Sequence, residues 1–136
     1  MTVHGDLSGV NVYFYFYGPT LTNNGSSVTV ANVYFASGPH TLQGTGSFSN
    51  NTATIQFDGT IDLGSNHQMS TVVIDSGGAF NLNGHTLSLS GAGTPLTNNG
   101  TFDTTGSTVV YNGTVPQTAA TTNVDYDSLG IDNGAG

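Results

Sequence analysis

The chain repeats itself at intervals of about 20 residues, and this internal repetition constrains its fold more than any other feature. Residues 52–63 read TATIQFDGTIDL and residues 71–82 read TVVIDSGGAFNL, which aligns Ile55 with Ile74 at an offset of 19 residues. Repeats of this length are typical of solenoids, in which each copy forms one coil and stacks on its neighbours.

Two further echoes extend the pattern. Residues 85–91 (HTLSLSG) align with residues 107–113 (STVVYNG) at an offset of 22, and LTNNG occurs at both 21–25 and 96–100, 75 positions apart. Four coils of about 19 residues account for the longer distance. We therefore expect matched Ile, Leu, Phe and Val residues to stack in ladders inside the coil, with matched Gly and Asn residues at its corners.

The predicted fold is all-β, a β-solenoid of about six coils with roughly 19–22 residues each. Strong helix formers are scarce, whereas β-branched and aromatic residues fall in short blocks bounded by Gly and Asn. Strands are expected at 10–17, 27–35, 46–48, 52–57, 60–63, 70–75, 79–82, 86–90, 107–111 and 123–131.

A β-sandwich or jelly roll with a donated strand is the alternative, because short strands with frequent turns also fit that architecture. Its best support is the segment Val10–Tyr17, VNVYFYFY, which is apolar on both faces. Such a strand lies in the middle of a structure or is donated to a neighbouring subunit. We therefore divide the chain into an aromatic N-terminal strand and assembly element, 1–20, and a repeat-built β domain, 21–136.

The charge composition excludes several classes of function. The chain has no Lys or Arg, and its eight acidic residues, all Asp, give a net charge of −8. Nucleic-acid binding needs cationic side chains to neutralise phosphates, so no nucleic-acid partner is expected. No apolar run is long enough for a transmembrane helix, so membrane insertion is not expected either.

The C-terminal two thirds resembles a known family. Residues 78–91 (GAFNLNGHTLSLSG), 96–113 (LTNNGTFDTTGSTVVYNG), 116–118 (PQT) and 126–133 (YDSLGIDN) are similar to Gly/Thr/Asn-rich repeat regions of large bacterial surface and adhesin-like proteins. The resemblance covers about 46–136 and is weak over 1–20. It implies a right-handed parallel β-helix, a secreted or cell-surface location and an adhesive or structural role, with no catalytic residues to carry over.

Metal, cofactor and enzyme chemistry find little support in the residues. The four histidines have no metal-ligand spacing and are expected as exposed turn residues. The pairs Asp125 and Asp127, and Asp58 and Asp62, are oxygen ligands of the kind calcium prefers, but the calcium-solenoid nonapeptide is missing, so solvated turn carboxylates are the default. Polysaccharide-cleaving β-helices usually rely on basic residues, which this chain lacks, so we expect no enzyme, no cofactor and no resident metal.

The first functional hypothesis is an extracellular structural protein, a subunit of a surface filament or fibre. Neither end of the predicted solenoid carries an obvious polar cap, so copies of the chain are expected to join by head-to-tail stacking or by strand donation. A strand that is apolar on both faces needs a second partner. The expected assembly interface comprises Val10, Val12, Tyr13, Phe14, Tyr15, Phe16, Tyr17, Leu129 and Ile131.

The alternative is an adhesin-type carbohydrate-binding module of a longer repeat protein, with glycans as partners. Tyr13, Tyr15 and Tyr17 would then form a stacking platform for sugars. The chain also contains Asn-x-Ser/Thr sequons, which are candidate glycosylation sites if it is exported. These sequons begin at Asn24, Asn50, Asn99 and Asn112.

Overall fold

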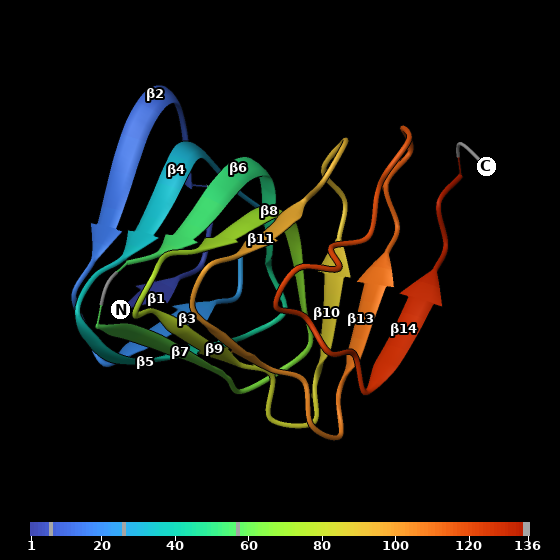
Figure 1. Cartoon of the computed structure of the whole chain (residues 1–136). Coiled ribbons are helices and arrows are strands. Elements are labelled where there is room, and N and C mark those ends of the chain that lie inside the picture. The colour runs from blue at the N-terminus through green and yellow to red at the C-terminus, as the bar shows by residue number, and fades with distance from the viewer. Residues whose placement is uncertain (6, 26, 57, 135–136) are drawn as a thin grey trace.

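The computed structural model describes residues 1–5, 7–25, 27–56 and 58–134, and for residues 3, 7, 8, 10–12, 27, 50 and 51 it describes the backbone alone. The described residues form strands and turns without a helix, and the strands lie in two sheets that face each other (Figure 1). The order of the first sheet is β1 (Thr2–Val3), β3 (Thr20–Asn23), β5 (Gly38–Gln43), β7 (Gly59–Leu63), β9 (Ala79–Asn81) and β12 (Thr101–Asp103).

The second sheet runs the length of the molecule. Its order is β14 (Ser128–Ile131), β13 (Thr108–Tyr111), β10 (Thr86–Leu89), β8 (His67–Ile74), β6 (Ser47–Ile55), β4 (Ser27–Phe35) and β2 (Leu7–Phe16), and β11 (Leu96–Asn98) also pairs with β8. Neighbours in each sheet are therefore one coil apart in sequence, so the chain winds alternately through the two sheets.

The strand pairs are parallel, and their registers establish the solenoid. Thr52 pairs with Thr71, 19 positions on, and Val72 pairs with Leu96, 24 positions on. One coil therefore takes about 20 residues. The fold is a β-solenoid of about six turns, as the repeats predict. The β-sandwich alternative is wrong, because its strands would pair antiparallel.

The predicted ladders form the core. Ile55 lies beside Ile74, and Leu89 lies beside Tyr111, as expected from the offsets of 19 and 22. One ladder runs through the whole second sheet and comprises the register positions Leu7, Val28, Phe48, Met69, Leu89, Tyr111 and Ile131. The chain has no Cys, Lys or Arg, so it has no disulfides and no Lys or Arg ion pairs. Its main stabilising contribution is therefore the burial of these apolar columns between the two sheets.

Five strands escaped prediction, and several predicted boundaries were wrong. Strands β1, β3, β5, β11 and β12 are short, or rich in Thr, Asn, Pro and His, so their composition resembles loops. The segments 46–48 and 52–57 belong to a single strand, β6, which crosses a register irregularity. The predicted strand 123–131 is shortened to β14, because its first half packs as a connecting segment instead of pairing in a sheet.

Two buried asparagines explain why LTNNG recurs. Asn23 and Asn98 point into the interior, and each Oδ1 accepts a hydrogen bond from the backbone N–H of the glycine two positions later, at 3.2 and 3.0 Å. Each Nδ2 donates to a carbonyl of the next coil, that of Ser47 or Asn123. The repeated phrase therefore builds the same polar corner twice, and its buried groups are satisfied.

Two histidines contradict the expectation of exposed turn positions. His40 and His67 are buried, at 2% and 3% exposure. His40 Nδ1 lies 2.7 Å from the carbonyl oxygen of Gly18, and its Nε2 lies 2.8 Å from that of Ala36. Each histidine occupies a core-facing position in a ladder, His40 beside Ile61 and His67 beside Leu87, where the ring links corners of neighbouring coils.

Candidate functional site

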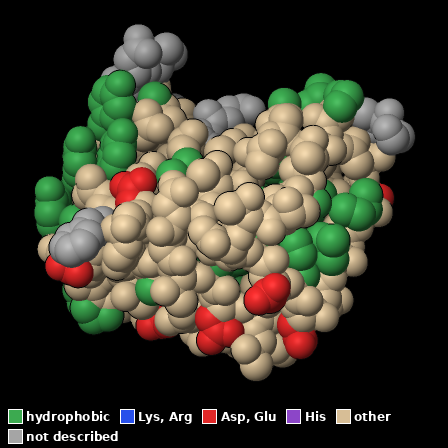
Figure 2. Space-filling view, in the orientation of Figure 1, with side chains coloured by type: hydrophobic (Ala, Val, Ile, Leu, Met, Phe, Trp, Pro, Cys, Tyr) green, Lys and Arg blue, Asp and Glu red, His purple; other side chains and the backbone are tan. Residues whose placement is uncertain are grey.

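The first candidate surface is the outer face of β2, the terminal strand of the second sheet. Phe16 points inward and is 4% exposed, whereas Tyr13, Tyr15 and Tyr17 point outward and are 57%, 50% and 73% exposed. Figure 2 shows hydrophobic side chains gathered along the edge that β2 occupies in Figure 1. The alternation of the strand therefore places the tyrosines where the sequence predicted, on the face away from the core.

The tyrosine rings stand on one another along the solenoid axis. Tyr15 pairs in register with Tyr34 of β4, and the two ring centroids lie 4.8 Å apart with planes only 12° from parallel. Tyr13 lies 6.1 Å from the same ring at an angle of 30°. The spacing of 4.8 Å is that of neighbouring strands. The rings of Tyr13, Tyr15 and Tyr34 thus form a ladder whose faces point along the axis, and we call these three residues the tyrosine ladder.

Tyr34 is the member of this ladder that was not singled out from the sequence. It lies at an offset of 19 from Tyr15, so the repeat spacing itself contains the signal that finds it. Beyond Tyr34 the same outward column continues through Thr54 and Val73. The aromatic part of the column is therefore confined to the first two coils of the sheet.

The second candidate surface lies at the opposite end of the sheet, on β14. Leu129 and Ile131 are 44% and 65% exposed, yet they are in register with Val109 and Tyr111, which are buried. These side chains occupy the inward-facing columns of the core. They are exposed because, among the described residues, the first sheet ends at β12 and has no strand opposite β14.

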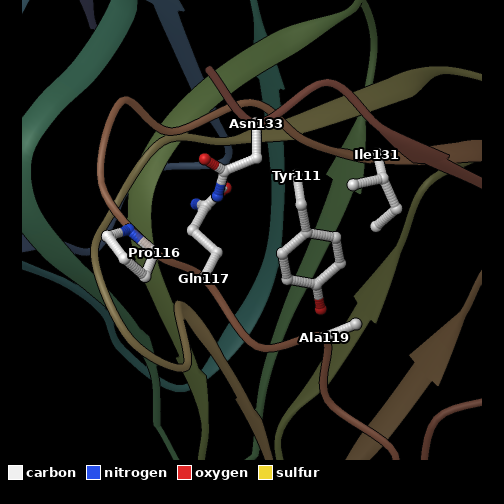
Figure 3. A pocket seen from close by; sticks show the side chains of 6 residues that line it. All are labelled: Tyr111, Pro116, Gln117, Ala119, Ile131 and Asn133. Atoms are coloured by element: carbon white, nitrogen blue, oxygen red, sulfur yellow. Dashed lines mark hydrogen bonds between the residues drawn. The ribbon is translucent and has the colours of Figure 1, made fainter. Parts of the chain in front are cut away.

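A hollow of about 130 Å³ opens beside Ile131. Figure 3 shows that Ile131 and Tyr111 line one side of it, with Gln117 and Asn133 on the other. Gln117 is held firmly, since its Nε2 donates to the carbonyls of Leu89 and Gly91 and its Oε1 accepts from the amide of Gly113. The hollow thus combines an apolar wall, continuous with the core, and a fixed polar wall.

A pair of tyrosines anchors the connecting segment behind this hollow. The hydroxyls of Tyr111 and Tyr126 lie 2.6 Å apart, and the Tyr126 hydroxyl donates to the Ala120 carbonyl at 2.8 Å. Burial, and then the hydrogen bond with Tyr111, raise the pKa of Tyr126 above its ordinary value. Tyr126 therefore stays neutral, and the hydrogen bonds of the two hydroxyls with Ala120 fasten residues 118–127 to the last coils.

The remaining predicted site residues are dispersed. The side chains of Val10, Val12 and Asn50 lie outside the described residues, and Phe14 is partly buried against the core. The sequon residues Asn24 and Asn99 are exposed, whereas Asn112 is half-buried and its Oδ1 is enclosed without a hydrogen-bond partner among the described residues.

The acidic residues do not gather into a cation site in the described part of the chain, where no group of three or more His or Asp side chains is placed to hold a metal ion. Asp62 instead accepts a hydrogen bond from Asn81 Nδ2 at 2.8 Å. Hydrogen bonds from the hydroxyl and amide of Thr105 hold the pKa of Asp103 below its ordinary value. No helix that could span a membrane occurs in the described ranges.

Comparison with known proteins adds no relative. No protein-family model matches the chain, and no significant match was found among curated proteins or among solved structures.

Proposed function

We propose that this chain is an extracellular structural protein, a subunit of a surface filament or fibre whose copies join through the ends of the solenoid, by head-to-tail stacking or by strand donation. The observation that carries the proposal is that apolar side chains are uncovered on both terminal strands of the same sheet. Exposed apolar clusters of this kind mark association sites.

The C-terminal end supports stacking because its open positions continue the core. The ladder that begins at register position Leu7 ends at Ile131, so a second copy stacked on β14 would place its β2 over Ile131 in the same column. Backbone N–H and C=O groups along the free edge of β14 would pair with those of the incoming strand. A contact between two different surfaces repeats without closing and builds a filament.

The N-terminal end supports association through its composition. Strand β2 contains no charged residue and no proline, which are the usual devices that keep an exposed edge strand from pairing with another chain. The ring of Tyr15 has one face covered by Tyr34, and its other face points out of the end of the stack. An apolar group of a second copy would cover that face and bury tyrosine area worth roughly a few kcal/mol.

The second candidate function is an adhesin-type carbohydrate-binding module, which the exposed tyrosines also favour. A sugar platform needs ring faces turned toward solvent across the sheet. In the tyrosine ladder, Tyr15 and Tyr34 instead cover each other's faces. The uncovered face of Tyr15 points along the axis, toward the end where a second copy would join, and this orientation favours assembly over glycan stacking as the role of the tyrosines.

Electron microscopy and sedimentation of the purified chain test the proposal. The wild-type chain is expected to form filaments, and two variants are expected to lose them: Tyr13→Ser/Tyr15→Ser/Tyr17→Ser at one end and Leu129→Asn/Ile131→Asn at the other. A matched control, Thr52→Ser/Thr71→Ser, changes outward residues of the same sheet and is expected to assemble normally.

If either end variant assembles normally, the residues changed in it are not part of the interface between copies. A wild-type chain that stays monomeric at all concentrations would contradict the proposal and indicate that a further coil of a longer chain covers β14. A monomer that binds glycans through the three tyrosines would establish the adhesin alternative.

A further inference from the structure

The dipeptide Asn-Gly occurs five times in the chain, beginning at Asn24, Asn83, Asn99, Asn112 and Asn133. In a flexible peptide this dipeptide modifies itself. The glycine nitrogen loses its proton and attacks Cγ of the asparagine, the new N–Cγ bond closes a succinimide ring, and the Cγ–Nδ2 bond breaks to release ammonia. Water then opens the ring to aspartate or isoaspartate, so the reaction needs no oxidant, reductant or enzyme.

In the folded chain the attacking N–H of each of these five glycines is already engaged. The five donors share one property, which is an acceptor oxygen within 3.2 Å. The pairs are Gly25 to Asn23 Oδ1 (3.2 Å), Gly84 to Ser107 Oγ (2.9 Å), Gly100 to Asn98 Oδ1 (3.0 Å), Gly113 to Gln117 Oε1 (2.8 Å) and Gly134 to the Gly113 carbonyl (3.2 Å).

Four of the five acceptors are side chains, and the structure fixes them in place. Asn23, Asn98 and Ser107 are buried, so each has few alternative conformations. Gln117 is fixed by its two hydrogen bonds to the carbonyls of Leu89 and Gly91. These side chains at the coil corners therefore accept hydrogen bonds from the glycine N–H groups that would otherwise attack.

We propose that these acceptors protect the five Asn-Gly pairs from deamidation. Ser107 and Gln117 in particular then determine which of the asparagines deamidate. A hydrogen-bonded N–H stays protonated and is held away from Cγ of the preceding asparagine. Ring closure then requires a local opening of the coil corner, and its rate falls by the equilibrium constant of that opening.

Modification would be costly for this fold in two ways. Each event adds a negative charge to a chain whose net charge is already −8 and which has no Lys or Arg to offset it. Isoaspartate also inserts a methylene into the backbone at a corner, where it would disturb the register of the stacked strands. The inference does not depend on the proposed filament, because it concerns the single chain.

Peptide mass spectrometry tests the proposal by measuring the rate of deamidation at each asparagine. The folded chain is kept in a mildly alkaline buffer, and the chain in urea is the unfolded reference. All five pairs are expected to convert more slowly in the folded chain. Ser107→Ala removes the acceptor of Gly84 and is expected to speed conversion of Asn83 by roughly two- to tenfold. Gln117→Leu is expected to do the same for Asn112.

The untouched pairs in each variant are the internal control. Acceleration confined to the pair that lost its acceptor supports the assignment. Folded and unfolded wild type converting at equal rates would overturn it, as would an unchanged Asn83 rate in Ser107→Ala. A uniform rise at all five pairs in both variants would also overturn it, because protection would then belong to global folding and not to these acceptors.

Discussion

The two ends of the long sheet expose apolar side chains for opposite reasons. On β2 the inward face is covered, with Phe16 buried, and the exposed residues are the outward tyrosines. On β14 the exposed residues, Leu129 and Ile131, face inward and are uncovered because the opposite sheet has ended. The exposure of the β2 tyrosines thus follows from the alternation of their own strand. The exposure of Leu129 and Ile131 follows from the position of β14 at the end of the stack.

This difference teaches that residue type alone does not identify an interface in a solenoid. Ile131 belongs to the same ladder as Met69 and Leu89, and it would be a buried core residue in any inner coil. Tyr15 would lie on the surface of any coil, because its side chain points outward, although an inner coil would half-bury it as it does Tyr34 in the same column. Substitutions on the two strands should therefore affect stability and assembly differently.

The largest effect is expected within β2 itself. Phe16→Ala should lower the free energy of unfolding by about 3–5 kcal/mol, because it leaves a cavity between the sheets. Its neighbour Tyr15→Ser should cost less than about 1 kcal/mol in the monomer, since only ring stacking is lost. Urea unfolding of both variants measures the contrast, and equal losses would show that the outward tyrosines support the fold.

A second prediction compares two residues of one ladder, one in an inner coil and one on β14. Leu89→Ala should cost about 2–5 kcal/mol, because the side chain is fully buried. Ile131→Ala, two register positions along the same column, should change the monomer by no more than about 0.5 kcal/mol. Thermal unfolding at a concentration below assembly checks the pair. A large loss for Ile131→Ala would mean that this end is already closed.

The smallest expected effect concerns His67, which lies beneath Leu87 in the column that ends at Leu129. Burial lowers the pKa of His67 below its ordinary value of 6.5, and the hydrogen bond with the Gly46 carbonyl opposes only part of this shift. The unfolded chain therefore takes up the proton first, so the contribution of neutral His67 to stability is complete above pH 6.5 and is lost as the pH falls through the lowered pKa.

Chemical denaturation of the wild type and of His67→Gln over the mildly acidic range measures this effect. The wild type should lose stability on acidification more steeply than the variant, which lacks the titrating ring. Parallel pH profiles would show that His67 does not titrate differently in the folded and unfolded chains.

Much of the fold was predictable because the repeat offset fixes register. Ile55 and Ile74 were matched from sequence and are neighbours in the structure. The prediction failed where polar residues face inward, as with His40 in β5, because an apolar pattern cannot reveal a polar core residue. Its partners are the carbonyls of Gly18 and Ala36, which only the folded coil brings within reach.

The two candidate surfaces were predictable to different extents for the same reason. The aromatic run in β2 is visible as a sequence anomaly, so Tyr13, Tyr15 and Tyr17 were identified in advance. Leu129 and Ile131 were also expected at the interface, but the sequence does not show that they occupy core-facing columns left open at the end of the stack. A solenoid stacks neighbouring coils only, so Ile131 lies beside Tyr111.

The most direct test of the central claim, that the chain is a solenoid whose ends join, is the axial repeat of the assembled protein in electron micrographs. Seven strands along the second sheet, from β2 to β14, at about 4.8 Å spacing predict filaments with a subunit rise of about 34 Å along the axis. Monomers of 13.9 kDa at every concentration would contradict end-to-end joining, and so would filaments with a very different rise.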